Sequence, residues 1–375
     1  MLRLLVFVLL IFITCSTRQQ NTIAWRNFIV HEKIKLPLGH DVTANTLSLN
    51  SFPLYRPTFL FYLHRGLNKA SVFNLHTGEL IKKISWESDG PNGIGYNTEF
   101  GYMHSFDSIF LISLLEQKIF FTDTTASVKK VYNIGLQITR PKGTYVHQLP
   151  GSSPSLSDSS LYLWSMKSFW DDFSSARGVI RYNLINQKAE EVFPYPSIYQ
   201  KYWWDHYHTL SGSTALPGKN NKVVWFSLDP YLYLLDDNNK PVKQIYAGSD
   251  KLNPVAIRKK RKEVFQSEDY ENYIKHIFKT GWYAQAYFDP YRNSYYRLGF
   301  YGSNKEYADP NQIFSNPFVV IVDNSNLNKI AEQTLDASVH NPLFSFVGPN
   351  GFYVLNKKDK LNDEEFLHFD VFRIQ

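Results

Sequence analysis

Short apolar segments recur along this 375-residue chain, and each is bounded by turn-forming residues. Within each segment the apolar residues are consecutive, so both faces of the predicted strand must be covered. In an antiparallel protein this happens when several small sheets stack face to face. Aromatic residues make up 16% of the chain, which favours packed strands over helices. The segments are 59–63, 109–112, 161–164, 223–226 and 318–322.

A second pattern accompanies these segments. A strand ends in Asn or Asp, a polar turn follows, and the next strand carries Lys or Glu. Asn and Asp start such turns because their side chains accept hydrogen bonds from the nearby backbone. The spacing is about 50 residues with one longer interval, and this period with four strands per unit is typical of a β-propeller. The alternative is an open pair of β-sandwiches with accidental spacing. The turn positions are Asn74, Asp123, Asn183, Asp236, Asp323 and Asp370.

The sixth repeat lacks an outer strand, because Gln375 follows too soon after Asp370. Residues 28–36 have the character of the missing strand, and their addition would leave only short, protected sheet edges. We therefore expect an all-β fold: a six-bladed β-propeller closed by an N-terminal strand.

The longest interval between turns indicates an insertion. Its apolar residues follow helical spacing, which predicts one amphipathic helix near 255–279 that lies on the propeller. The basic run 258–262 precedes them and either contacts phospholipid or another acidic partner, or is simply solvated. The apolar residues are Tyr270, Tyr273, Ile274, Ile277 and Phe278.

The chain begins with a charged residue, Arg3, and an apolar run from Leu4 to Ile13. This run is too short to span a bilayer core, which takes about 20 residues, and it has the length of a signal peptide. Residues 12–15 resemble the lipobox of bacterial lipoproteins, in which the Cys becomes acylated. We therefore expect a signal peptide at 1–14, a lipid on Cys15, a polar tether at 15–22 and a single domain at 23–375. The alternative is a plain signal peptide cut nearby, which leaves a soluble protein.

Cys15 is the only cysteine, so an intrachain disulfide is excluded. The expected location is the bacterial cell envelope, with the lipid anchor in the outer membrane. The net charge of +6 is too weak to indicate nucleic-acid binding.

The segment Tyr287-Phe288-Asp289-Pro290-Tyr291-Arg292-Asn293-Ser294-Tyr295-Tyr296-Arg297-Leu298 is a strand, a turn and a return strand. It resembles a segment of a family of uncharacterised bacterial propeller lipoproteins, the domain of unknown function 4221. The resemblance extends to the overall length and to the N-terminus. It implies a six-bladed propeller and supplies no activity, ligand or catalytic residue.

Aromatic residues crowd the connector at 195–208 between two predicted blades. Rings that the core does not need could stack on a sugar or clamp a peptide, and the other interpretation is that they pack within the loop. His206 and His208 would share one side of a strand, but two ligands do not make a metal site. His104, His147, His208 and His340 fall near predicted inner-strand starts and could line a central channel. The predicted binding face is Tyr199, Tyr202, Trp203, Trp204, His206, His208 and Arg292.

The sequence carries no G-x-S-x-G elbow and no complete catalytic constellation. The leading prediction is a lipid-anchored, monomeric, non-catalytic binding or scaffold protein with a protein or glycan partner and without a metal or cofactor. The alternative is an envelope enzyme that acts on glycans through residues at the channel mouth. Two carboxylates at catalytic separation, or three converging metal ligands, would favour the enzyme.

Overall fold

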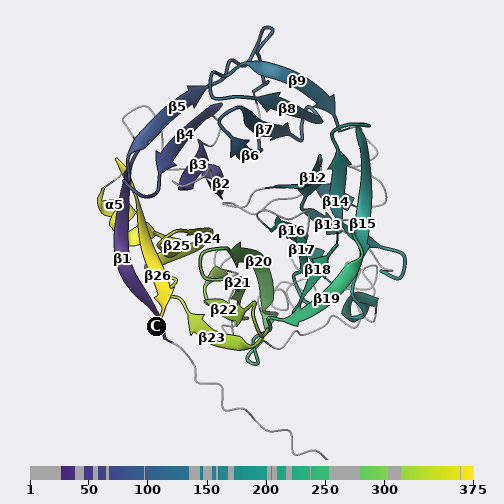
Figure 1. The fold of residues 1–375 in the computed structure, drawn as a ribbon, viewed down its shortest axis with the longest axis vertical. Helices are drawn as coiled ribbons and strands as arrows, with labels where there is room; N and C mark the ends of the chain where they lie inside the picture. Colours follow the sequence, from purple (N-terminus) through teal and green to yellow (C-terminus); the bar gives the residue numbers. More distant parts are fainter. Residues whose placement is uncertain are drawn as a thin grey trace, which may run out of the picture.

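Six antiparallel sheets stand side by side around a ring (Figure 1). The computed structural model describes residues 27–38, 46–53, 58–64, 67–96, 98–134, 144–146, 154–157, 159–167, 173–200, 204, 209–216, 222–236, 238–252, 279–302, 314–363 and 365–375. Five of the sheets have four strands and one has six. The arrangement is a six-bladed β-propeller, which confirms the fold class predicted from the repeats.

The blades follow the chain in order. Blade 1 holds β2 (Thr46–Pro53), β3 (Thr58–His64), β4 (Lys69–Asn74) and β5 (Leu80–Ser85). Blade 2 holds β6 (Phe100–Ser105), β7 (Ser108–Ser113), β8 (Lys118–Thr122) and β9 (Val128–Asn133). Blade 3 holds β11 (Ser155–Ser157), β12 (Ser160–Leu163), β14 (Arg177–Asn183) and β15 (Lys188–Pro194).

Blade 4 holds β16 (Ser211–Ala215), β17 (Lys222–Phe226), β18 (Tyr231–Leu235) and β19 (Pro241–Tyr246). Blade 5 holds β20 (Trp282–Asp289), β21 (Ser294–Phe300), β22 (Pro317–Asp323) and β23 (Lys329–Thr334). Blade 6 holds β24 (His340–Gly348), β25 (Gly351–Asn356), β26 (Phe366–Ile374) and β1 (Phe28–Pro37).

The innermost strand of every blade begins at the same end of the ring. We call this the connector end, because the chain passes from blade to blade there. The opposite, hairpin end carries the turns between the first and second strands and between the third and fourth.

The N-terminal strand closes the ring as predicted. β1 pairs antiparallel with β26 from Phe28 opposite Ile374 to Pro37 opposite Phe366, with one bulge between Val30 and Glu32. The Phe28 ring is buried and stacks on Phe372 at 5.1 Å. Blade 6 is thus built from both ends of the chain, and no other blade is.

Five of the six predicted turn residues hold a turn between the third and fourth strands. In blade 1, Asn74 Oδ1 accepts hydrogen bonds from the backbone N–H groups of His76 and Thr77. Asp123, Asn183, Asp236 and Asp323 accept equivalent bonds from the backbone of Thr125, Ile185, Asn238 and Ser325. The prediction for Asp370 is wrong: it lies inside β26, because the outer strand of blade 6 comes from the N-terminus.

Blades 3 and 4 share a continuous piece of chain. β12 belongs to blade 3, while β13 (Ser165–Lys167), which follows after Trp164, pairs with β16 of blade 4. β10 (Thr144–Val146) pairs with β13 and extends the same sheet. The backbone N–H of Val179, in β14 of blade 3, donates to both Ser165 Oγ and Ser211 Oγ, each at 3.0 Å. Blade 3 is therefore hydrogen-bonded to β13 and β16 of the blade 4 sheet.

The predicted helix near 255–279 and the basic run 258–262 lie outside the described residues, apart from Lys279. The described part of the chain holds one α-helix, α5 (Lys357–Asn362), and one 3-10 helix, η2 (Ser197–Gln200). Asn356 caps α5 by accepting from the Asp359 backbone N–H at 2.9 Å. Among the described helices none is long and apolar enough to span a bilayer.

Candidate functional site

Two residues of the predicted binding face, Tyr199 and Trp204, are buried, with exposed fractions of 1% and 2%. The Tyr199 ring packs against Tyr195 and Phe173. Its hydroxyl accepts a hydrogen bond from the Leu228 backbone N–H at 2.9 Å. These rings fix the connector between blades 3 and 4 to the core, and they do not form an exposed surface.

The other connector residues of that face, Tyr202, Trp203, His206 and His208, lie outside the described residues. Their part in binding stays a prediction. Of the proposed channel histidines, His104 is exposed, and His340 is buried with its Nε2 2.8 Å from Asp370 Oδ2. His147 also lies outside the described residues.

Arg292 lies at the hairpin end of blade 5, in the β20–β21 turn, so the structure separates it from the connector at 195–208. Its Nη1 is 2.9 Å from Asp289 Oδ2, and its Nη2 donates to the Pro349 carbonyl of blade 6 at 2.7 Å. The neighbouring Tyr291 hydroxyl is hydrogen-bonded to Thr58 of blade 1. This turn therefore ties blade 5 to blades 6 and 1.

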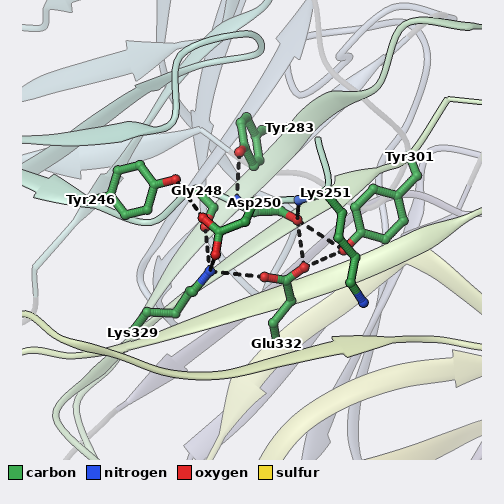
Figure 2. Close-up of polar contacts among 9 residues, drawn as sticks. Tyr246, Gly248, Asp250, Lys251, Tyr283, Tyr301, Lys329 and Glu332 are labelled. Carbon is green, nitrogen blue, oxygen red and sulfur yellow. Dashed lines mark hydrogen bonds and ion pairs between the residues drawn. The ribbon is translucent and has the colours of Figure 1, made fainter. Parts of the chain in front are cut away.

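A polar cluster joins the chain that leaves blade 4 after β19 to the end of β21 and the outer strand β23 of blade 5 (Figure 2). We call it the latch and define it as Ser249, Tyr301, Lys329 and Glu332. Ser249 Oγ donates to Glu332 Oε1 at 2.6 Å, and the Tyr301 hydroxyl donates to the same oxygen at 2.5 Å. Lys329 Nζ lies 3.2 Å from Glu332 Oε2, so both carboxylate oxygens are engaged.

The latch also holds the backbone that leaves blade 4. Lys329 Nζ donates to the Gly248 carbonyl at 3.3 Å and lies 3.1 Å from Asp250 Oδ2. The Ser249 backbone N–H donates to the Tyr283 hydroxyl at 2.9 Å. Residues 248–250 are thus held by the side chains of Tyr283, Lys329 and Glu332 of blade 5.

Burial and hydrogen bonding oppose each other at the latch carboxylate. Desolvation would raise the pKa of Glu332, but the hydrogen bonds from Ser249, Tyr301 and Lys329 outweigh it and hold the pKa below its usual value. Burial, together with the bond to Glu332, raises the pKa of Tyr301. Glu332 is therefore a stable carboxylate at neutral pH and a poor general base.

Two long connections begin at the latch. Residues 253–278 follow Leu252, and residues 303–313 follow Gly302. Their ends meet, because a Cβ on Gly302 would lie 1.9 Å from the Lys279 carbonyl oxygen, and one on Gly281 would lie 3.2 Å from Leu252 Cγ. Phe314, where the second connection returns, packs on Phe300 at 5.3 Å. The four loop ends form one compact base.

The sequence interpretation missed the latch. Lys329 and Glu332 lie in an outer strand, where charged residues are usually solvated, and Ser249 is 83 positions away from Glu332. One signal was present: the strand 329–334 carries Ile330 and Ala331 beside its charges, and both are buried. Apolar residues in an outer strand indicate that another part of the chain covers the outer face of that strand.

A second buried cation lies near the predicted face. The Lys167 side chain is 1% exposed and forms an ion pair of 2.6 Å with Glu191. Burial lowers the pKa of Lys167, and the contact with Glu191 acts in the opposite direction. Within the described ranges, no group of three or more His, Cys, Asp or Glu side chains is arranged to hold a metal ion.

The six sheets of the ring and its closure by β1 define a six-bladed β-propeller. Residues 32–334 match the family described as Domain of unknown function (DUF4221). The chain belongs to this DUF4221 family, which confirms the resemblance seen at 287–298.

Two solved structures are similar to this chain. A DUF4221 family member from Bacteroides vulgatus has a TM-score of 0.75 and 17% sequence identity, over 94% of this chain and 99% of that one. A candidate exported protein from Bacteroides fragilis has a TM-score of 0.56 and 11% identity, over 96% and 98% of the two chains. At these identities the likeness shows the fold alone. No curated protein matches the chain.

Proposed function

We propose that this protein is a lipid-anchored propeller of the bacterial cell envelope that acts as a non-catalytic binding or scaffold protein. Its partner, a protein or a glycan, is bound at the connector end above blades 4 and 5. The observation that carries the proposal is the latch, which holds the bases of the connections 253–278 and 303–313 together on a rigid ring. Binding sites are commonly built from loops that such a scaffold positions.

The geometry of the ring supports this assignment. Asn27, the first described residue, lies at the hairpin end, because Phe28 pairs with Ile374 there. A tether from Cys15 would thus join the ring at the hairpin end, opposite the connector end that we propose for the partner.

An envelope location is supported by the signal-length apolar run before Cys15. It agrees with the Bacteroides fragilis relative, which is named as a candidate for export.

The binding proposal is tested by capture of partners from native membranes. The variant replaces residues 253–278 with four Gly/Ser residues, which suffice because Leu252 and Gly281 lie in contact. The matched control replaces Ile185 and Asn186, in a hairpin-end turn of blade 3, with Gly-Gly. We expect the loop variant to keep its melting temperature and lose the partner, and the control to keep both. If the loop variant captures as much partner as the wild type, the proposal is overturned.

The anchor is tested separately. Cys15→Ala should abolish incorporation of a labelled fatty acid and release the protein from the membrane fraction, whereas Ser16→Ala should do neither. Wild-type protein that takes up no label and is soluble after cell lysis contradicts the lipid anchor and leaves the binding proposal standing.

A further inference from the structure

Arg297 is a fully buried arginine in the seam between blades 4 and 5, with an exposed fraction of 0%. Its Nη2 donates to the carbonyl oxygens of Phe226, at 2.7 Å, and Asp229, at 3.1 Å. The guanidinium carbon lies 4.5 Å from the centre of the Tyr283 ring and 5.6 Å from that of Trp225. The cation is thus sandwiched in aromatic surroundings contributed by both blades.

Two donor atoms of this guanidinium, Nε and Nη1, have no hydrogen-bond partner within the described part of the chain. Burial lowers the pKa of Arg297 to about 10, so the group is still charged at neutral pH. A buried N–H of a charged group that lacks an acceptor carries the full desolvation penalty. The aromatic faces attract the charge but are weak hydrogen-bond acceptors.

A further unpartnered donor, on Trp225, lies in the same seam, and another, on Trp164, lies next to it where blades 3 and 4 join. The indole Nε1 atoms of Trp225 and Trp164 are buried without an acceptor in the described structure. The two rings contact edge to face, with centroids 4.8 Å apart, and their exposed fractions are 0% and 6%. All of these orphan groups are donors, so what they lack is an acceptor.

The charge balance limits the choice of acceptor. Asp229 is the carboxylate that interacts with Arg297 through space, but both of its oxygens are occupied. Oδ1 accepts from the Tyr231 backbone N–H at 3.2 Å, and Oδ2 accepts from the Tyr233 hydroxyl. With one negative charge already near, a doubly charged sulfate or phosphate would be strongly disfavoured.

We propose that a buried monovalent anion of about the size of chloride binds between blades 4 and 5, held by Arg297 Nε and Nη1 and by the Trp225 indole N–H. This site is separate from the partner surface at the connector end. The anion would stabilise the ring by supplying the acceptor that the seam lacks.

Bromide is the probe. Thermal unfolding of the full chain is measured at constant ionic strength while sodium bromide replaces sodium gluconate, whose anion is too large for a buried seam. A ligand that binds only the folded state raises the melting temperature with the logarithm of its concentration above the Kd. We expect this rise for the wild type, and diffraction from bromide-grown crystals should show an anomalous peak within hydrogen-bond distance of the Arg297 guanidinium.

Trp225→Phe removes one donor and keeps an aromatic ring in place. We expect it to weaken the apparent bromide affinity by about tenfold, which corresponds to one lost hydrogen bond to an ion. The matched control is Trp86→Phe, because the Trp86 indole donates to Thr122 Oγ1 at 3.0 Å between blades 1 and 2. It should lower the melting temperature without changing the bromide dependence.

The proposal is overturned if bromide and gluconate give equal melting temperatures, or if both variants show the same bromide dependence as the wild type. It is also overturned if the crystals show water at Arg297 in place of the anomalous peak.

Discussion

Asp289 and Arg292 form an ion pair of 2.9 Å within a single turn, and the carboxylate side is completely buried while the guanidinium side is 22% exposed. Asp289 Oδ1 also accepts from the backbone N–H groups of Tyr291 and Arg292. The most recognisable segment of the sequence is therefore a structural element, which holds the β20–β21 turn in the shape that reaches blades 6 and 1.

Arg292→Met should lower the free energy of unfolding by about 2–3 kcal/mol, because it leaves a buried carboxylate without its charged partner. Urea unfolding measures the change. Arg181→Met is the matched control: its partner Glu190 is 51% exposed, whereas Asp289 is buried, so water can solvate the carboxylate that is left and the loss should be at most about 0.5 kcal/mol. If Arg292→Met instead keeps full stability and loses the partner, Arg292 belongs to the binding face that the sequence predicted.

Phe28→Ala tests the closure of the ring. The Phe28 ring contacts Phe372, Phe352 and Tyr296, so its removal from the core should cost about 3–4 kcal/mol. Val30→Ala, on the same strand but 42% exposed, should change stability by less than about 0.5 kcal/mol. Equal urea midpoints for the two variants would show that β1 is not part of the folded ring.

Trp204→Ala should destabilise the protein by about 3–5 kcal/mol, because its ring is buried in the hydrophobic core and packs on Tyr199. Tyr96→Ala removes an aromatic ring that is 67% exposed and should change stability by less than about 0.5 kcal/mol. The readout is the melting temperature. A stable Trp204→Ala protein that no longer captures a partner would return Trp204 to the binding face.

Glu332→Gln tests the electrostatics of the latch. The pKa of Glu332 is lower in the folded protein than in the unfolded chain, so its contribution to stability is complete above the unfolded value of about 4.3. It is lost as the pH falls through the lower, folded pKa. The Gln variant should be less stable than the wild type at pH 7, and the difference should shrink toward pH 3.

Urea unfolding at several pH values between 3 and 7 measures this dependence. Glu87→Gln is the control, because Glu87 is an exposed carboxylate near a blade connector, and its curve should follow that of the wild type. If the free energies of unfolding of the wild type and Glu332→Gln differ by the same amount at every pH, the inferred pKa shift is contradicted.

The blade architecture could be read from the sequence because it depends on local rules. Asn74 and its counterparts form turns with residues two or three positions away, and the consecutive apolar residues of β22 report that both of its faces are covered. The place of β1 in blade 6 followed for a similar reason, since the last blade lacked an outer strand and one unassigned strand remained.

The contacts at the site could not be read in this way, because each depends on residues far apart along the chain. Ser249 and Glu332 meet only once blades 4 and 5 are packed, and nothing near either residue predicts the other. The burial of Tyr199 and Trp204 could not be read either, because the sequence does not distinguish aromatic rings needed for packing from rings free to bind. Arg297 carried a signal that the sequence interpretation did not use: it is the one charged residue of β21, a strand in which every residue is buried.

The closing strand has a mechanical consequence. The Gln375 backbone N–H donates to the Asn27 carbonyl at 2.9 Å, so the last residue and the start of β1 lie side by side. Any pull on the N-terminal segment therefore acts first on β1, and it loads the hydrogen bonds between β1 and β26 beginning at Phe28. Tension on the chain would open blade 6 while the other five blades keep all of their strands, so the strand that completes the ring is also the place where force would first undo it.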